Sequence, residues 1–219
     1  MVESNWSITL GDRAEILIRD ETGLPVRLFL PAHHNETAKG NTLSGASLEA
    51  QARKYQGMFS GLGQFADPPQ VIPTNTTTGE VMRSFDWTRM YRSVLFESQS
   101  LRVSVNSVSG ELVAAQLENW GALPTNSLGT IGQARAQEIA LKRVREAFSD
   151  SPCRLVRSLR RIVQRNRYWI DRSPYRLPES RFAWLVIVMV SEKPPQWITV
   201  GIDSQTGEPI SGELLENRG

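Results

Sequence analysis

Few residues of this chain have side chains suited to catalysis or metal binding. Its only two histidines, His33 and His34, are adjacent in a Pro-Ala-His-His-Asn segment, and Cys153 is its only cysteine. A metal site built on this pair would need carboxylates for its other ligands, and a Ser-His-Asp or Cys-His group would need one of the same two histidines. We therefore expect the pair to lie in an exposed loop, and we expect no catalytic residue and no metal site.

Carboxylates are the alternative source of catalysis. Asp86, Glu97 or Glu179 could serve a carboxylate-dependent hydrolase, which would hold two of them in one concave pocket with perturbed pKa values. Gly61 to Ala66 also matches the dinucleotide-binding fingerprint by letters. That fingerprint must follow a strand and open a helix, whereas here it follows a predicted helix and indicates its end. We expect no cofactor and no enzyme activity, and we keep the hydrolase as the less favoured alternative.

One segment of the chain is strongly basic. Eight arginines lie between Arg154 and Arg176 against the single acidic residue Asp171, although the net charge of the chain is only +2. Arginine binds carboxylates and phosphates through paired hydrogen bonds, and aromatic neighbours could stack on bases. The alternative is a solvated hairpin face whose charges discourage edge-to-edge strand pairing. If the segment binds a partner, we expect an acidic protein surface rather than nucleic acid, and the candidate residues are Arg157, Arg160, Arg161, Arg165, Tyr168 and Trp169.

Length and composition indicate a globular chain. Its 219 residues are 40% hydrophobic and 22% charged, which allows one large domain or two of about 100 residues each. No stretch approaches the roughly 18 consecutive apolar residues of a membrane helix. The most apolar run, Phe182 to Val190, is rich in β-branched residues and predicts a buried strand. Residues 1–5 show no signal-peptide pattern, which fits a cytoplasmic protein or one whose signal peptide has been removed.

An internal repeat is visible at an offset of 97 residues. Residues 85–113 align without gaps on residues 182–210. Chance would give about two identities over such a length, whereas seven are found. They are Phe85, Trp87, Gln99, Val103, Ser107, Gly110 and Glu111, each matched 97 positions later. In both copies an alternating strand runs into a turn that begins with Asn or Asp and ends with Gly, which predicts a short-loop hairpin.

Each full copy begins with a predicted helix. Ser47 is the expected N-cap of the first, and the second opens with a capping-box pattern at Thr130. The segment from Ala66 to Gly79 is predicted to be a loop. A third, partial copy, Ile18 to Val26, aligns with Ile202 to Ile210 and has strands without a preceding helix. The predicted domains are a partial N-terminal repeat of β-strands at 1–31, a first unit at 32–118 and a second unit at 119–219.

The order of these elements resembles the PepSY family and its propeptide relatives. The residues that carry the resemblance are Ala136–Phe148, Trp184–Val190 and Ile198–Ile210, with Trp87 and Leu101–Val113 as a weaker copy that has Asn106 for Asp and Ser109 for Thr. The expected fold class is therefore α+β, with tandem helix-plus-antiparallel-sheet units of PepSY-like or cystatin-like type and an extra N-terminal β-hairpin.

The resemblance also implies a function and a location. Domains of this family bind or inhibit rather than catalyse, and in protease precursors they act as propeptides, so a peptidase is an alternative partner. The implied setting is extracytoplasmic: secreted, periplasmic or on the cell surface of a bacterium. A second interpretation makes the chain a purely structural repeat segment of a larger cell-surface protein.

Overall fold

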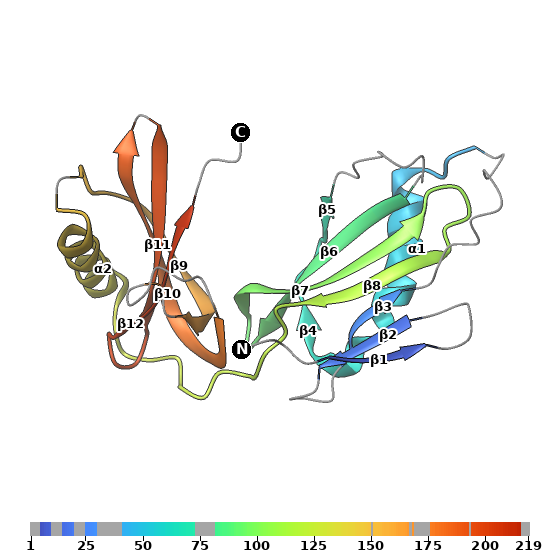
Figure 1. Ribbon diagram of the computed structural model, residues 1–219, viewed down its shortest axis with the longest axis horizontal. Coiled ribbons are helices and arrows are strands. Elements are labelled where there is room, and N and C mark those ends of the chain that lie inside the picture. Colours follow the sequence, from blue (N-terminus) through green and yellow to red (C-terminus); the bar gives the residue numbers. More distant parts are fainter. Residues whose placement is uncertain are drawn as a thin grey trace. The chain divides into compact units, whose positions relative to one another are not determined.

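The structure is a computed structural model that describes residues 5–9, 15–19, 25–29, 41–72, 82–149, 151–166, 168, 176–192 and 194–215. The chain divides into two compact units (Figure 1). The first comprises Met1–Met90 and Gln99–Trp120, and the second comprises Tyr91–Ser98 and Gly121–Gly219. The predicted domain boundaries were placed from the sequence repeat, whereas this division reflects packing in the structure. The boundaries therefore stay predictions.

In the first unit a helix covers one face of an antiparallel sheet. Strands β6, β7 and β8 form its centre, β3 pairs with β8, and β4 and β5 pair with β6. The elements are β1 (Asn5–Thr9), β2 (Glu15–Arg19), β3 (Pro25–Phe29), α1 (Gly45–Gly57), the 3-10 helix η1 (Ser60–Leu62), β4 (Gln64–Phe65), β5 (Gln70–Ile72), β6 (Met82–Tyr91), β7 (Val94–Asn106) and β8 (Leu112–Glu118).

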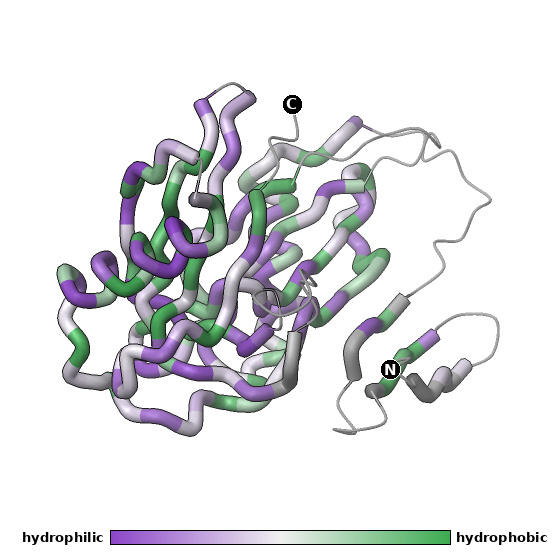
Figure 2. The backbone as a smooth tube through the Cα atoms, turned by 60° about the vertical axis from the view of Figure 1, so that its left-hand side comes forward, coloured by the Kyte–Doolittle hydropathy of each residue, from purple (hydrophilic) through white to green (hydrophobic). Residues whose placement is uncertain are grey.

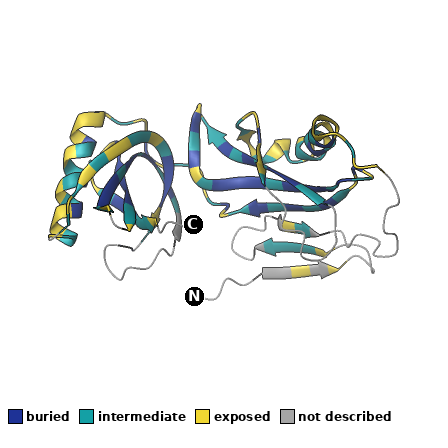
Figure 3. Ribbon diagram, turned by 90° about the horizontal axis from the view of Figure 1, so that it is seen from above, coloured by how far each residue is buried: buried dark blue, intermediate teal, exposed yellow. Residues whose placement is uncertain are grey.

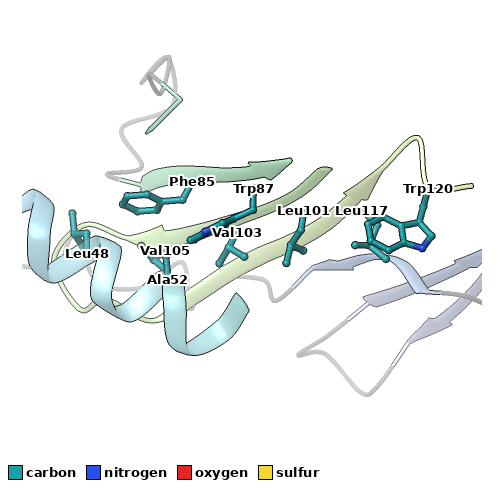
Figure 4. Packing of buried hydrophobic residues seen from close by; sticks show 9 residues of the cluster. All are labelled: Leu48, Ala52, Phe85, Trp87, Leu101, Val103, Val105, Leu117 and Trp120. Carbon is teal, nitrogen blue, oxygen red and sulfur yellow. The ribbon is translucent and has the colours of Figure 1, made fainter. Parts of the chain in front are cut away.

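The core of the first unit lies between α1 and the central strands. Buried and partly buried residues alternate along β8, so that one face of the sheet is buried. Figure 2 shows hydrophobic and hydrophilic residues interspersed along the strands. Figure 4 shows Leu48 and Ala52 of α1 facing this apolar face. Phe85 and Trp87 lie in the same cluster with ring centroids 6.1 Å apart.

The second unit contains one helix and a curled sheet. Its elements are α2 (Gln133–Ala147), β9 (Arg154–Asn166), β10 (Arg176–Glu192), β11 (Pro195–Asp203) and β12 (Pro209–Leu215). The strands β9 to β12 pair antiparallel in chain order. The Asn166 side chain donates to the carbonyl of Gly212 at 2.9 Å and accepts from its amide at 3.0 Å, which ties β9 to β12. The apolar side of α2 is buried on the sheet and its opposite side is exposed (Figure 3).

The predicted fold class, α+β with tandem helix-plus-antiparallel-sheet units, is wrong. The structure is mostly β, and its strands form a curled, mixed sheet. It is mixed because Phe96 of β7 pairs in parallel with Ile162 of β9. The 97-residue repeat detects similar local segments, whereas strand pairing depends on contacts between segments distant in the sequence. Strand β7 of the first predicted unit pairs with β9 of the second.

The two predicted hairpin turns have the same local hydrogen bonds. The Oδ1 atom of Asn106 accepts from the amides two and three residues later at 2.8 and 3.0 Å. The Oδ1 atom of Asp203 does the same at 2.7 and 3.0 Å. Gly110 and Gly207 close the turns with φ of +73° and +76°, values that L side chains rarely adopt. Both turns are confirmed, while the tandem repeat as a whole stays a prediction.

Three local predictions need correction. Ser44, rather than Ser47, caps α1, and its Oγ atom accepts from the Ser47 amide at 3.2 Å. Gly132, rather than Thr130, is the N-cap of α2. The helices start where they do because the chain just before each is fixed on a hairpin turn by a backbone hydrogen bond. The strand β5 also lies within the segment 66–79 that was predicted to be a loop, because its backbone pairs with β6.

Shortening a buried side chain of the first core should destabilise it. Leu101→Ala removes three carbons from a residue that is 0% exposed, and we expect its free energy of unfolding to fall by about 2–5 kcal/mol. Urea denaturation followed by tryptophan fluorescence measures this. Leu123→Ala is the control, because Leu123 is 45% exposed and its replacement should change stability by no more than about 0.5 kcal/mol. Equal effects of the two variants would contradict the packing described.

Candidate functional site

The basic segment forms β9, and the strand distributes its arginines over both faces of the sheet. The face that carries Ser158 and Arg160 is the one covered by α2. The Oγ atom of Ser158 accepts from Gln133 and Gln137 of α2, each at 2.8 Å. The guanidinium of Arg160 lies over the Trp184 ring, 4.8 Å from its centroid. Arg160 is nevertheless exposed, so its charged group lies at the edge of this face and contacts solvent.

Arg157 and Arg161 project from the opposite face, because side chains alternate along a strand. Arg157 pairs in register with Ile187, and Arg161 pairs with the buried Ala183. Arg157 is exposed and Arg161 is partly exposed. Within the described part of the chain, Arg157, Arg160 and Arg161 form no ion pair with a carboxylate. We call these three residues the arginine edge.

Arg165 differs from the arginine edge because it is neutralised by carboxylates. Its guanidinium lies 3.1 Å from Glu208 and 3.9 Å from Glu179. Glu179 also lies 3.6 Å from Arg181, which in turn bonds Asp203 at 2.7 Å. Arg165 therefore belongs to a charge network that joins β9, β10 and the β11–β12 turn, and it is less available to a partner than the arginine edge.

The carboxylate of Asp203 is the buried end of this network. It accepts from Arg181 Nε, from Asn126 Nδ2 at 3.3 Å and from two turn amides. Burial alone would raise the pKa of Asp203, but the hydrogen bonds from the Thr206 amide, Arg181 and the Gln205 amide outweigh it and lower the pKa below its usual value. The ionised form therefore stabilises the turn.

The two aromatic candidates of the same segment are not placed as a stacking pair. Tyr168 is only 6% exposed, so its ring contributes to the packed interior rather than to an open platform for bases. Trp169 lies outside the described residues, as do His33 and His34. The part of the proposed surface that the structure brings together is thus the arginine edge.

A buried arginine of the first unit shows the contrast with the arginine edge. Arg89 is 6% exposed, donates to Gln99 at 2.7 Å and lies 4.0 Å from the centroid of the Trp120 ring. Burial lowers its pKa to about 10, so that it remains charged at neutral pH. Its contacts are those of a residue that completes a core.

The carboxylates considered for hydrolysis lie on three strands, and Asp86 of β6 is the most buried of them, with an Oδ1 atom that is buried without a hydrogen-bond partner among the described residues. Asp86 lies 3.9 Å from Arg102 in the first unit. Glu97 is exposed, and Glu179 takes part in the network of Arg165. A hollow of about 500 Å³ lies in the first unit beside Arg53, Asp67 and Trp87. None of the three carboxylates lines it, and Arg53 within it is already bonded to Glu49 and Asp67 at 2.6 and 2.7 Å.

Neither a candidate metal site nor a candidate membrane-spanning helix is present within the described ranges. No group of three or more His, Cys, Asp or Glu residues there could hold a metal ion. No helix there is long and apolar enough to cross a membrane.

Sequence reasoning missed that β9 is bulged and that its arginines divide between two faces. Between Leu155 and Arg157 the register with β10 shifts, so that Val156 is an extra residue. The segment has no strict hydrophobic alternation that would indicate this shift. The positions of the arginines could have indicated the division, because odd and even positions of a strand face opposite sides. Positions 157 and 161 are odd, whereas position 160 is even.

Comparison with known proteins gives structural likeness at very low sequence identity. No family model matches the chain, and no curated protein matches it either. Among solved structures, an uncharacterized protein from Eubacterium rectale ATCC 33656 matches with a TM-score of 0.51 and 8% identity, over 96% of this chain and 76% of that one. The Bacillus megaterium YpeB C-terminal domain matches with a TM-score of 0.44 and 12% identity, over 99% and 91%. The first of these likenesses shows a shared fold, and the PepSY family stays a prediction.

Because Asp203 is ionised in the folded state, we expect the free energy of unfolding to decrease at low pH. Because its folded-state pKa is depressed, its contribution is present above the unfolded value of about 3.9 and is lost as pH falls through the lower folded value. Asp203→Asn should lower the free energy of unfolding at pH 7 by about 1–3 kcal/mol and flatten its dependence on pH between 5 and 2. Urea denaturation at a series of pH values measures both effects.

Glu208→Gln is the matched control for this experiment. Its carboxylate is 57% exposed in the same network, so we expect a change of no more than about 0.5 kcal/mol and an unchanged acid dependence. Asn106 already occupies the equivalent place in the other turn with the same amide bonds, so asparagine fits this geometry. An Asp203→Asn protein with the acid profile of the wild type would show that the charge does not stabilise the turn.

Proposed function

We propose that this chain is a non-catalytic, PepSY-like binding or inhibitory module that recognises an acidic protein surface through the arginine edge. The observation that carries the proposal is the display of Arg157, Arg160 and Arg161 on β9 without a carboxylate partner in the described part of the chain. Such charges gain most when a partner desolvates them and supplies carboxylates.

The fold itself does not require these charges. Arg165, further along β9, forms ion pairs with Glu208 and Glu179. The chain therefore neutralises an arginine where that arginine supports the structure. The first unit has no comparable arginine cluster in the corresponding sequence. These two facts support a binding function over a purely structural repeat segment.

The extracytoplasmic location and the absence of enzyme activity belong to the same proposal. The location rests on the PepSY resemblance of the residues around β10 and β11. The absence of activity rests on the scarcity of histidine and cysteine in the sequence and on the separate roles found for Asp86 and Glu179. A peptidase of the bacterial envelope is the partner class that the resemblance favours.

The test is capture of envelope proteins on the immobilised chain at low salt, where charge contacts are least screened. Arg157→Gln, Arg160→Gln and Arg161→Gln are combined in one variant. The control removes the same charge from the outer side of α2, as Arg135→Gln, Lys142→Gln and Arg145→Gln. We expect the first variant to lose the acidic proteins that the wild type and the control retain, as measured by quantitative mass spectrometry. If both variants retain the same proteins, the arginine edge is only a solvated face and the proposal is wrong.

A further inference from the structure

The outer side of β9 lacks a partner strand over much of its length. Strand β9 pairs with β10 on one side from Arg154 to Asn166. On its other side it pairs with β7, and within the described residues the register is the single pair Phe96 and Ile162. From Arg154 to Arg160 no described strand therefore pairs with the outer side of β9. Unpaired strand edges of this kind are templates for another extended chain.

The backbone groups that face outward can be assigned from the pairing of β10. The amide of Ser204 donates to the carbonyl of Phe182 at 3.0 Å, so the backbone groups of Phe182 point toward β11. Backbone groups alternate in direction along a strand, and those of Trp184 and Val186 point the same way. Their partners in the register are Arg160 and Ser158. The amides and carbonyls of Ser158 and Arg160 therefore point away from β10, toward the outer edge.

One of these outward backbone groups already forms a hydrogen bond with a side chain. The carbonyl oxygen of Arg160 accepts from Nη1 of Arg161 at 3.0 Å, in an exposed position. An arginine side chain that satisfies an edge carbonyl is easily exchanged for the amide of an incoming strand, and its guanidinium is then released for a carboxylate. The edge is also interrupted on its N-terminal side by the bulge at Val156, which is 48% exposed, so pairing is limited to a short stretch.

The charges of the arginine edge select the kind of chain that can pair here. Arg157 and Arg161 project from one face and Arg160 from the other, so a partner that contacts all three must lie alongside the strand rather than on either face. Like charges placed opposite one another disfavour a second copy of the same edge, whereas carboxylates in these places are favoured. Arg157 and Arg161 are four residues apart, which is about 13 Å in a strand, and match acidic residues at the same spacing.

We propose that an extended acidic peptide segment adds as a strand to the outer edge of β9, bonded to the backbone of Ser158 and Arg160 and with carboxylates opposite Arg157 and Arg161. This inference rests on the proposed function and names the form in which the acidic partner binds. Main-chain hydrogen bonds supply affinity in this mode of recognition, and the flanking side chains supply specificity.

The experiment uses the full chain and a defined probe. The probe is a fluorescein-labelled nine-residue peptide in which Glu alternates with Thr and Val, and its control has Lys in place of every Glu. Fluorescence anisotropy at low salt measures the Kd. We expect the Glu peptide to bind at least about tenfold more tightly than the Lys peptide, and we expect Arg157→Gln combined with Arg161→Gln to remove that preference. Arg135→Gln combined with Lys142→Gln on α2 should change the Kd less than about threefold, because these charges lie off the edge.

Ser158→Pro tests strand addition separately from charge. It removes an outward amide that is not part of the ladder with β10, a position where a proline is tolerated. We expect it to weaken binding of the Glu peptide at least about tenfold, since a main-chain bond and the fit of the strand are both lost. Ser158→Ala, which keeps the amide but loses the contacts to Gln133 and Gln137, should weaken binding less than about threefold.

A second measurement guards against misfolding of the proline variant. In the wild type, saturating Glu peptide should slow amide hydrogen exchange at Ser158 and Arg160, as observed by NMR. If exchange there is unchanged and Ser158→Pro binds like the wild type, strand addition is wrong. A loss of binding in the Arg157/Arg161 variant would then leave the proposed function standing.

Two other results would also overturn the inference. Equal binding of the Glu and Lys peptides would show that the edge does not select acidic segments, and the capture experiment would then decide the proposed function independently. Self-association of the wild type in sedimentation that Ser158→Pro abolishes would mean that the edge pairs with a second copy.

Discussion

In each unit a backbone hydrogen bond joins the segment before the helix to the sheet that the helix covers. The amide of Leu43 donates to the carbonyl of Ser107 at 2.8 Å, and the amide of Ile131 donates to that of Ser204 at 2.9 Å. Each bond joins the residue before a helix N-cap to the turn of a hairpin. The start of the helix and the end of the strand are thereby set together, so the apolar stripe of the helix meets the apolar face of the strands.

Other interactions in each turn hold the acceptor carbonyl, that of Ser107 or Ser204, in position. Asn106 and Asp203 hold the turn amides, and glycines with positive φ close the turns. In the second unit the packing is closer still. A Cβ atom on Gly129 would meet the backbone of Ser204, so this approach of chain to turn requires glycine. The buried charge of Asp203 then draws Arg181 and Glu179 into one network.

The same arrangement explains where the second unit can interact with other molecules. The helix covers one face of the sheet, and the bonds of Asn166 to Gly212 tie its first strand to its last. In the described part, a short length of the outer side of β9 has no strand partner, and neither does the outer side of β12, the last strand of the order. Arginines on β9 serve two purposes, because they oppose pairing with a like strand and attract a chain of the opposite charge. The two interpretations of the basic segment, a protected edge and a binding surface, are thus physically compatible.

The sequence by itself determined the local structure of this protein. It predicted an alternating strand before each hairpin turn, and Asn or Asp with glycine predicted both turns, because side-chain periodicity and φ restrictions act over a few residues. Arg157, Arg160 and Arg161 were also among the candidate residues taken from the sequence. Only the tertiary structure decided that the strands form a mixed, curled sheet, that Ser44 rather than Ser47 caps α1, and that Arg165 is bonded while Arg157 is not. Each of these depends on segments distant in the chain that meet through pairing or burial, and a single sequence does not specify those partners locally.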